Sequence, residues 1–206
     1  MANSDIAEKM YPTADWVKFA LDLPMSDKKE IGEKWNYFTA GVIILGDIIN
    51  KSVPEGLEAY ADEKLFKPLG ITEYDWPQTP QKVPSTAGGL RLSALDFAKY
   101  GQLYKNDGKW NGKQILPRHW VEKTFTKQIN RGDGEFYGYL FWNGFFKVNG
   151  KEYETFFATG NGGNKIFVFK DQPLVVVITA TAYGTWYMHV QASSMMEQYI
   201  LPAVLE

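Results

Sequence analysis

Residues 35–51, WNYFTAGVIILGDIINK, decide how the chain is organised. Their second half holds a dense apolar run over residues 42–49, which predicts a helix that is buried on most of its circumference. The first half is polar, and Tyr37 and Thr39 lie immediately before that run. We therefore expect a rigid, buried helix to hold two hydroxyl groups at its N-terminal end. That arrangement is suited to a functional site.

The segments around this helix also have helical patterns and end at helix-breaking residues. Pro24 ends the first of them, Ser93 followed by Asp96 resembles a capping box, and Pro117 stands at a helix start. A stretch rich in proline and glycine, residues 72–89, predicts a long loop whose aromatic residues pack nearby. The predicted helices span residues 15–23, 54–65, 94–105 and 118–125.

Beyond Asn130 the pattern changes to period two, with many β-branched and aromatic residues. Asn149-Gly150 is a strong hairpin signal, and residues 186–200 predict a last amphipathic helix lying across the sheet. The predicted strands span residues 137–142, 145–148, 153–157, 165–169 and 174–180. The expected fold class is therefore α+β, with a mainly helical region with long loops (1–130) followed by an antiparallel sheet with a C-terminal helix packed on it (131–206).

Composition narrows the kind of partner. The chain has 206 residues, is 45% hydrophobic and 16% aromatic, and carries a formal net charge of -2. A globular core is expected, and the charge argues against a nucleic-acid binder, so we expect a small-molecule partner. No apolar run approaches the roughly 20 residues of a membrane helix. The first twelve residues have no signal-peptide pattern and resemble a loop within a protein.

We expect neither a metal nor an organic cofactor. The sequence has no cysteine, and its two histidines, His119 and His189, fall on separate predicted helices without partners at ligand spacing. A solvent-facing or half-buried ring on a helix is the interpretation we favour for both.

A glycine- and asparagine-rich stretch, residues 158–165 (ATGNGGNK), precedes one predicted strand. Glycines allow a ligand to approach exposed backbone amides, which suits an oxyanion site. A glycine bulge or tight turn at a strand start explains the same residues equally well. Since no helix follows, the stretch is not a phosphate-binding loop.

Two further features have a functional and a purely structural interpretation. Tyr37 can act as a general base only where nearby positive charge lowers its pKa. Without such a charge, the simpler interpretation of Tyr37 is a structural tyrosine in the core. Ser26 and Lys29 form an S-x-x-K sequence, which can be an activated nucleophile at the start of a buried helix. Because their surroundings are charged and follow Pro24, we interpret them as a solvated loop.

Four segments in this order resemble one family: residues 35–52, WNYFTAGVIILGDIINKS; 65–71, LFKPLGI; 87–117, AGGLRLSALDFAKYGQLYKNDGKWNGKQILP; and 158–179, ATGNGGNKIFVFKDQPLVVVIT. They are similar to the serine β-lactamase and penicillin-binding-protein-like hydrolases, in the class C-like esterase branch. The resemblance covers nearly the whole chain from about Tyr11 and implies part of a β-lactamase/transpeptidase-like fold.

The resemblance implies roles for seven residues. Tyr37 matches the tyrosine of a Tyr-x-Asn motif, while Thr39 stands where asparagine is usual. Thr159 and Gly160 match a Lys-Thr-Gly or His-x-Gly motif, but Ala158 occupies the basic position. The amide of Asn161 then falls where the family places half of its oxyanion hole, and Gly162 and Gly163 follow it. With no cation at Ala158, neutral substrates are expected unless another Lys or Arg reaches the site.

The family's S-x-x-K nucleophile lies on a helix well upstream of the tyrosine motif, whereas Ser26 lies only eleven positions before Tyr37 and in a different context. We therefore expect the C-terminal portion of a serine hydrolase of esters, amides or lactams, inactive by itself. A non-catalytic binding or assembly module on the same scaffold is the alternative. We also expect an open sheet edge along residues 165–169 or an adjacent strand, covered by a second copy, by the missing N-terminal portion or by the chain's own N-terminus. Many family members are extracytoplasmic, but this sequence assigns no location.

Overall fold

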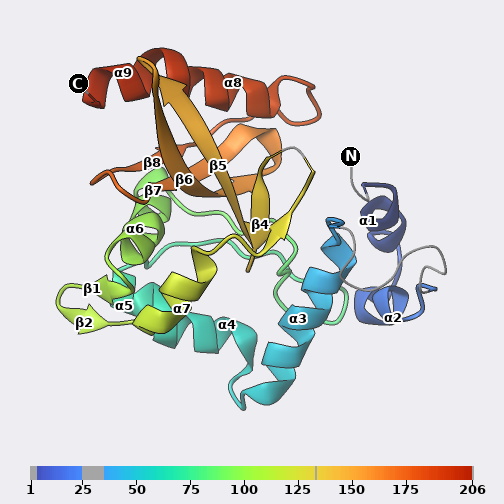
Figure 1. Ribbon diagram of the computed structural model, residues 1–206. Coiled ribbons are helices and arrows are strands. Elements are labelled where there is room, and N and C mark those ends of the chain that lie inside the picture. The colour runs from blue at the N-terminus through green and yellow to red at the C-terminus, as the bar shows by residue number, and fades with distance from the viewer. Residues whose placement is uncertain (1–3, 25–34, 133, 206) are drawn as a thin grey trace. The chain divides into compact units, whose positions relative to one another are not determined.

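The computed structural model describes residues 4–24, 35–132 and 134–205 (Figure 1). The chain divides into two compact units, Met1–Leu92 and Ser93–Glu206, which are described one at a time. The change in sequence pattern at residue 130 lies inside the second unit, because helices α6 and α7 belong with the strands. As a domain boundary, residue 130 stays a prediction.

The first unit consists of short helices around α3. Asp15 caps α2, and its side chain accepts a hydrogen bond from the amide of Lys18. The N-terminal segment that the sequence suggested to be a loop is instead helix α1, whose Met10 is buried against Ala40 and Ile43. The helices are α1 (Ser4–Met10), α2 (Trp16–Leu21), α3 (Thr39–Ser52), α4 (Gly56–Ala61), the π-helical turn η1 (Asp62–Phe66) and α5 (Lys67–Leu69).

Helix α3 forms where predicted, but its burial differs from the prediction. Only Ala40, Ile43 and Gly46 are buried, whereas Leu45 and Ile48 are 51% and 53% exposed. The buried residues recur every third position, so a single narrow stripe faces the neighbouring helices. The prediction of burial on most of the circumference was therefore wrong, because apolar composition alone does not show which side of a helix is covered.

The segment between α5 and the second unit is irregular, as predicted, and is held by aromatic packing. The ring of Phe66 lies 4.7 Å from that of Tyr74 and 5.9 Å from that of Trp76, between centroids. The indole of Trp76 donates a hydrogen bond to the carbonyl of Ser85 at 2.8 Å. These contacts fix a long loop within the first unit.

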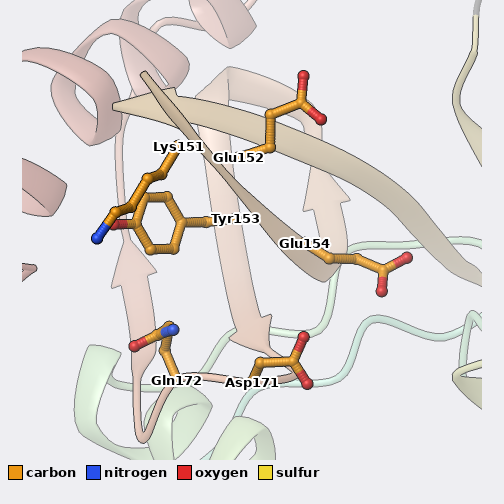
Figure 2. Close-up of a pocket in the computed structure, with 6 residues that line it drawn as sticks. All are labelled: Lys151, Glu152, Tyr153, Glu154, Asp171 and Gln172. Carbon is orange, nitrogen blue, oxygen red and sulfur yellow. The ribbon is translucent and has the colours of Figure 1, made fainter. Parts of the chain in front are cut away.

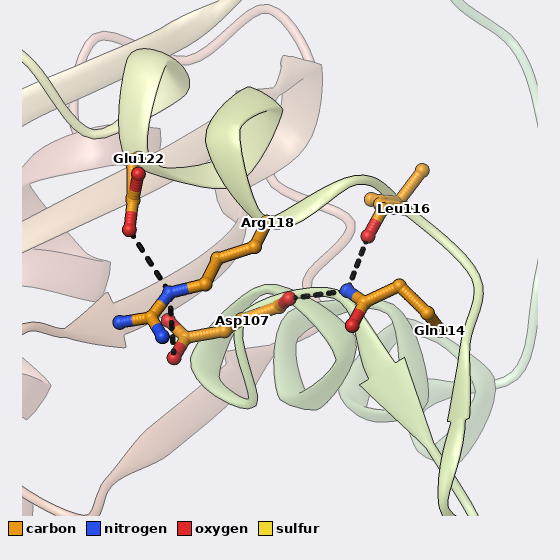
Figure 3. Close-up of polar contacts among 5 residues, drawn as sticks. All are labelled: Asp107, Gln114, Leu116, Arg118 and Glu122. Atoms are coloured by element: carbon orange, nitrogen blue, oxygen red, sulfur yellow. Dashed lines mark hydrogen bonds and ion pairs between the residues drawn. The ribbon is translucent and has the colours of Figure 1, made fainter.

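The second unit begins with α6 (Ala94–Lys105), whose first turn is capped by the hydroxyl of Ser93. A small hairpin, β1 (Lys109–Trp110) and β2 (Lys113–Gln114), leads to α7 (Arg118–Thr124). Figure 3 shows how this connection is held: the Gln114 amide donates to the carbonyls of Asp107 and Leu116, and the Nε of Arg118 lies 2.9 Å from Glu122 and 3.8 Å from Asp107.

The sheet of the second unit is an antiparallel meander, because each strand pairs with the next in sequence. Asn149 and Gly150 form the predicted hairpin, with φ of 51° and 77°. The single strand predicted at residues 137–142 was wrong, since Tyr139 and Leu140 also have positive φ and turn the chain back. The strands are β3 (Ile129–Asn130), β4 (Phe136–Gly138), β5 (Phe141–Val148), β6 (Lys151–Gly160), β7 (Asn164–Phe169) and β8 (Val175–Ile178).

Helices cover both faces of this sheet within the second unit. One face carries Phe167 and Phe169, which share a buried cluster with Ala192 and Met196 of the C-terminal helical segment. That segment, α8 (Met188–Met195), η3 (Met196–Ile200) and α9 (Leu201–Val204), crosses the strands in Figure 1. On the other face a Cβ at Gly101 of α6 would meet Ile166 at 2.9 Å. The predicted α+β class, with a C-terminal helix packed on an antiparallel sheet, is confirmed.

Candidate active site

Tyr37 and Thr39 lie in the first unit at the start of α3. Thr39 is the first residue of the helix, and Tyr37 precedes the N-cap residue Phe38. Burial raises the pKa of Tyr37, and the nearby Tyr11 adds to the increase. The described surroundings therefore favour the neutral phenol, which can donate a proton but is a poor base.

The glycine-rich stretch of the second unit is the turn of the β6–β7 hairpin. Strand β6 ends at Gly160, residues Asn161–Gly163 form one turn of 3-10 helix, and Gly160 pairs with Asn164 to close it. The side chain of Asn161 accepts a hydrogen bond from the amide of Gly162 at 2.8 Å, and Asn164 donates to the carbonyl of Asn161 at 2.7 Å. Thr159, Gly160, Asn161, Gly162 and Gly163 are thus brought together on one tight hairpin.

Both glycines that end this turn are required by their surroundings. Gly162 has a φ of 81°, and a Cβ there would lie 2.7 Å from the ring of Tyr183. Gly163 has a φ of 91°, and its Cβ would lie 2.5 Å from the carbonyl oxygen of Met188. The amide of Ala182 also donates to the carbonyl of Gly162 at 3.1 Å. The segment before α8 therefore packs directly on the hairpin and fixes its backbone.

The end of β6 has a strand on one side only. Its pairing with β5 stops at Phe157, whereas its pairing with β7 continues to Gly160. Within the described residues, the outer edge from Ala158 to Gly160 therefore pairs with no strand. Edge amides and carbonyls of this kind can bind an extended ligand, and the amide of Asn161 follows them directly.

Lys165, to which the sequence pattern assigned no role, also lies in this region. Lys165 lies directly opposite Thr159 across the β6–β7 ladder and is only 7% exposed. Burial lowers its pKa to about 8, although Glu135 acts in the opposite direction. Its position in the sequence could have indicated this burial. Lys165, Phe167 and Phe169 alternate along the strand, so they lie on the same face of the sheet.

His189 also lies in this region. It belongs to the first turn of α8 and is half-buried, in agreement with the interpretation of it as a ring on a helix. Burial lowers its pKa, and the charge of Lys165 lowers it further. Its Nδ1 is buried and has no hydrogen-bond partner, and the same is true of Oγ1 of Thr159. Two polar atoms without partners therefore accompany the buried lysine.

A hollow lies at the other end of β6 (Figure 2). Its volume is about 410 Å³, and three of the six residues that line it are acidic. Because it adjoins the first residues of β6 and not the hairpin at the last, it is separate from the candidate site. It is lined by Lys151, Glu152, Tyr153, Glu154, Asp171 and Gln172.

Two kinds of feature are absent from the residues that the structure describes. No group of three or more histidine, cysteine, aspartate or glutamate side chains there is arranged to hold a metal ion. No helix there is both long and apolar enough to cross a membrane.

Comparison with known proteins identifies the family. The profile of the family described as Beta-lactamase matches residues 1–198. The chain belongs to the Beta-lactamase family. No curated protein matches this family member in sequence.

Two solved structures share the fold of this Beta-lactamase family chain. One, from Bacillus anthracis, is described as a candidate 6-aminohexanoate-dimer hydrolase, with a TM-score of 0.70 and 20% identity over 88% of this chain and 49% of that one. The other is an octameric penicillin-binding protein homologue from Pyrococcus abyssi, with a TM-score of 0.66 and 22% identity over 90% and 48%. The chain therefore spans about half the length of these structures.

Membership of the Beta-lactamase family does not by itself assign roles to residues. Tyr37 and Thr39 belong to the first unit and the hairpin residues to the second, and their catalytic roles stay predictions. Ser26 and Lys29 lie outside the described residues.

Proposed function

We propose that this chain supplies the tyrosine and the oxyanion site of a serine hydrolase that cleaves esters, amides or lactams through an acyl-enzyme. The observation that carries the proposal is the β6–β7 hairpin, where the backbone of Ala158–Gly160 has a free edge and the amide of Asn161 follows it. Family membership supports a hydrolase scaffold.

In this mechanism the serine oxygen attacks the substrate carbonyl carbon, and the carbonyl oxygen becomes an oxyanion. The amide of Asn161 donates to that oxyanion, which stabilises the tetrahedral state. The proton that the serine hydroxyl loses is passed to the leaving group, which departs and leaves an ester on the serine. Water then hydrolyses that ester, releases the acid and restores the serine hydroxyl. Thr159 and Gly160 hold the substrate along the edge of β6.

Tyr37 fits the proton-donating half of this cycle. Its raised pKa keeps the phenol protonated in the surroundings that the first unit provides. Action as a base requires a neighbouring cation, which the lysine of an S-x-x-K motif provides in the proposed enzyme. Thr39, at the first position of α3, places a second hydroxyl two residues further along the chain.

The nucleophile is proposed to come from outside these residues. The sequence contains one S-x-x-K, Ser26–Lys29, and it stands in a charged segment only eleven positions before Tyr37. We therefore expect the purified chain to hydrolyse a p-nitrophenyl ester no faster than buffer does. A rate above buffer that disappears in Ser26→Ala would contradict this and would make Ser26 and Lys29 the catalytic pair.

A non-catalytic assembly module is the second candidate, and the open edge of β8 favours it. Strand β8 is last in the sheet order and pairs only with β7 among the described strands. One structural neighbour is described as octameric, which supports self-association of this scaffold. The two alternatives are distinguished in a protein that also contains an S-x-x-K helix. Turnover of an ester by that protein supports the enzyme, and no turnover supports the non-catalytic module.

A further inference from the structure

The side chain of Asn164 joins the β6–β7 turn to the segment that follows β8. Its Nδ2 donates a hydrogen bond to the carbonyl of Asn161 at 2.7 Å and another to the carbonyl of Ala180 at 3.1 Å. Its Oδ1 accepts a hydrogen bond from the amide of Ala180, also at 3.1 Å. Two donor hydrogens and an acceptor of one side chain are therefore in use, which is a combination that a hydroxyl or a carboxylate cannot supply.

The contacts with Ala180 anchor this side chain outside the turn. They extend the pairing of β7 with β8 beyond its last backbone pair, Lys165–Ile178. The amide group of Asn164 exchanges two hydrogen bonds with the backbone of Ala180, as two paired residues of antiparallel strands do. The remaining hydrogen bond, to the carbonyl of Asn161, therefore ties the turn to the sheet.

Asn164 acts on both sides of the Asn161 amide. Its backbone pairs with Gly160, the residue before that amide, and its side chain holds the carbonyl of Asn161, which comes after it. The side chain of Asn161 is also engaged, because it accepts from the amide of Gly162 at 2.8 Å. A rotation that redirects the Asn161 amide therefore has to displace a group that is already hydrogen-bonded.

We propose that Asn164 is a positioning residue, whose side-chain amide holds the Asn161 carbonyl so that the Asn161 amide keeps one direction. Oxyanion donors are effective because they are oriented before charge develops on the substrate. Without the Asn164 amide, the turn has to be ordered again in each catalytic cycle. The inference rests on the proposed function, since the direction of the Asn161 amide affects catalysis only if that amide binds the oxyanion.

Backbone order in the purified chain tests this positioning without turnover. In NMR relaxation, the order parameter of the Asn161 amide should be about 0.85, as in rigid backbone, and should fall below about 0.6 in Asn164→Ala. Gln114→Ala is the matched control, because Gln114 also donates through its side-chain amide to two carbonyls, those of Asp107 and Leu116. It should leave the order of Asn161 unchanged. An order parameter that stays near the rigid value in Asn164→Ala would overturn the proposal.

Asn164→Asp is a second variant, which keeps the size of the side chain and the acceptor for the Ala180 amide but loses both donors. The order of Asn161 should be low at neutral pH and should increase below about pH 4, where the introduced carboxyl is protonated and can donate again. The wild-type chain at each pH is the reference. Recovery of order shows a lost hydrogen bond and not a failure to fold, whereas order that does not change with pH would contradict the proposed bond.

Kinetics test the consequence for catalysis, in a protein that contains both this chain and an S-x-x-K helix of the family. Asn164→Ala should lower kcat for a p-nitrophenyl ester about tenfold to a hundredfold and leave KM within about twofold, because the oxyanion forms only in the transition state. Gln114→Ala should leave both constants within about twofold of the unaltered protein. Equal losses in the two variants would show that Asn164 acts through stability alone and would overturn the proposal. No turnover by the unaltered protein would refute the hydrolase function, while the order of Asn161 still decides this inference.

Discussion

At the scale of single residues, Lys165 shows most clearly how burial alters chemistry. It is the second residue of β7, is followed by four apolar residues and lies under a helix, where burial lowers its pKa to about 8. The unfolded chain holds the same group near its ordinary value of 10.5. Lys165 in the folded chain therefore costs stability whenever it is protonated.

This difference predicts a dependence of stability on pH. The folded pKa lies below the unfolded one, so the unfolded chain binds more protons between pH about 8 and about 10.5, and the free energy of unfolding contributed by Lys165 rises across that window. The rise should reach up to about 3 kcal/mol at about 1.4 kcal/mol per pKa unit. Urea unfolding measures it. The gap between Lys165→Met and wild type should be large below the window and small above it, whereas a constant gap would refute the assignment.

Gly162 gives a second prediction at this scale, with Gly112 as its matched control. Both have positive φ, 81° and 78°, but only Gly162 has a neighbour, the Tyr183 ring at 2.7 Å from an added Cβ. Alanine should strain both backbones, while the clash adds about 1–3 kcal/mol at Gly162 alone. Urea unfolding of Gly162→Ala and Gly112→Ala measures the difference, and equal losses would show that the packing on the hairpin is not tight.

At the scale of elements, the sequence predicted what local chemistry determines. Ser93 caps α6, Pro117 precedes α7 and Asn149-Gly150 turns the hairpin, because each signal acts within a few residues. The turn at Tyr139-Leu140 was missed, since neither residue favours positive φ and only the pairing of β4 with β5 imposes it. The exposed side of α3 was not predicted either, because which side of a helix is exposed depends on the elements that pack against it.

The open edge of β8 predicts that chains associate with one another. Val175–Ile178 pairs with β7 on one side and with no described strand on the other. An apolar edge of this kind promotes pairing between chains, so the average mass from light scattering should rise with protein concentration. A monomer at all concentrations, with β8 amides protected from hydrogen exchange, would show instead that the edge is covered within one chain.

At the scale of the whole molecule, the linked motifs predicted the family correctly, because their order along the chain is more specific than any one of them. The candidate site was predictable only in part. The hairpin residues are adjacent in sequence, whereas Lys165 and His189 join Thr159 through strand register and helix packing. A sequence pattern indicates composition and period, but register is set by tertiary structure.

The central claim, that the hairpin is an oxyanion site, is tested most directly at Asn161. Proline at the first position of the 3-10 turn removes only the amide donor from the backbone, and Gly160 before it already has the extended conformation that a following proline prefers, with φ −117° and ψ 163°. Asn161→Ala keeps the amide and is the control.

The measurement is kcat for p-nitrophenyl ester hydrolysis by a protein that contains both this chain and an S-x-x-K helix of the family. We predict a loss of about a hundredfold to a thousandfold in Asn161→Pro and only a few-fold loss in Asn161→Ala. Equal rates in the two variants, or no turnover by the unaltered protein, would contradict the account.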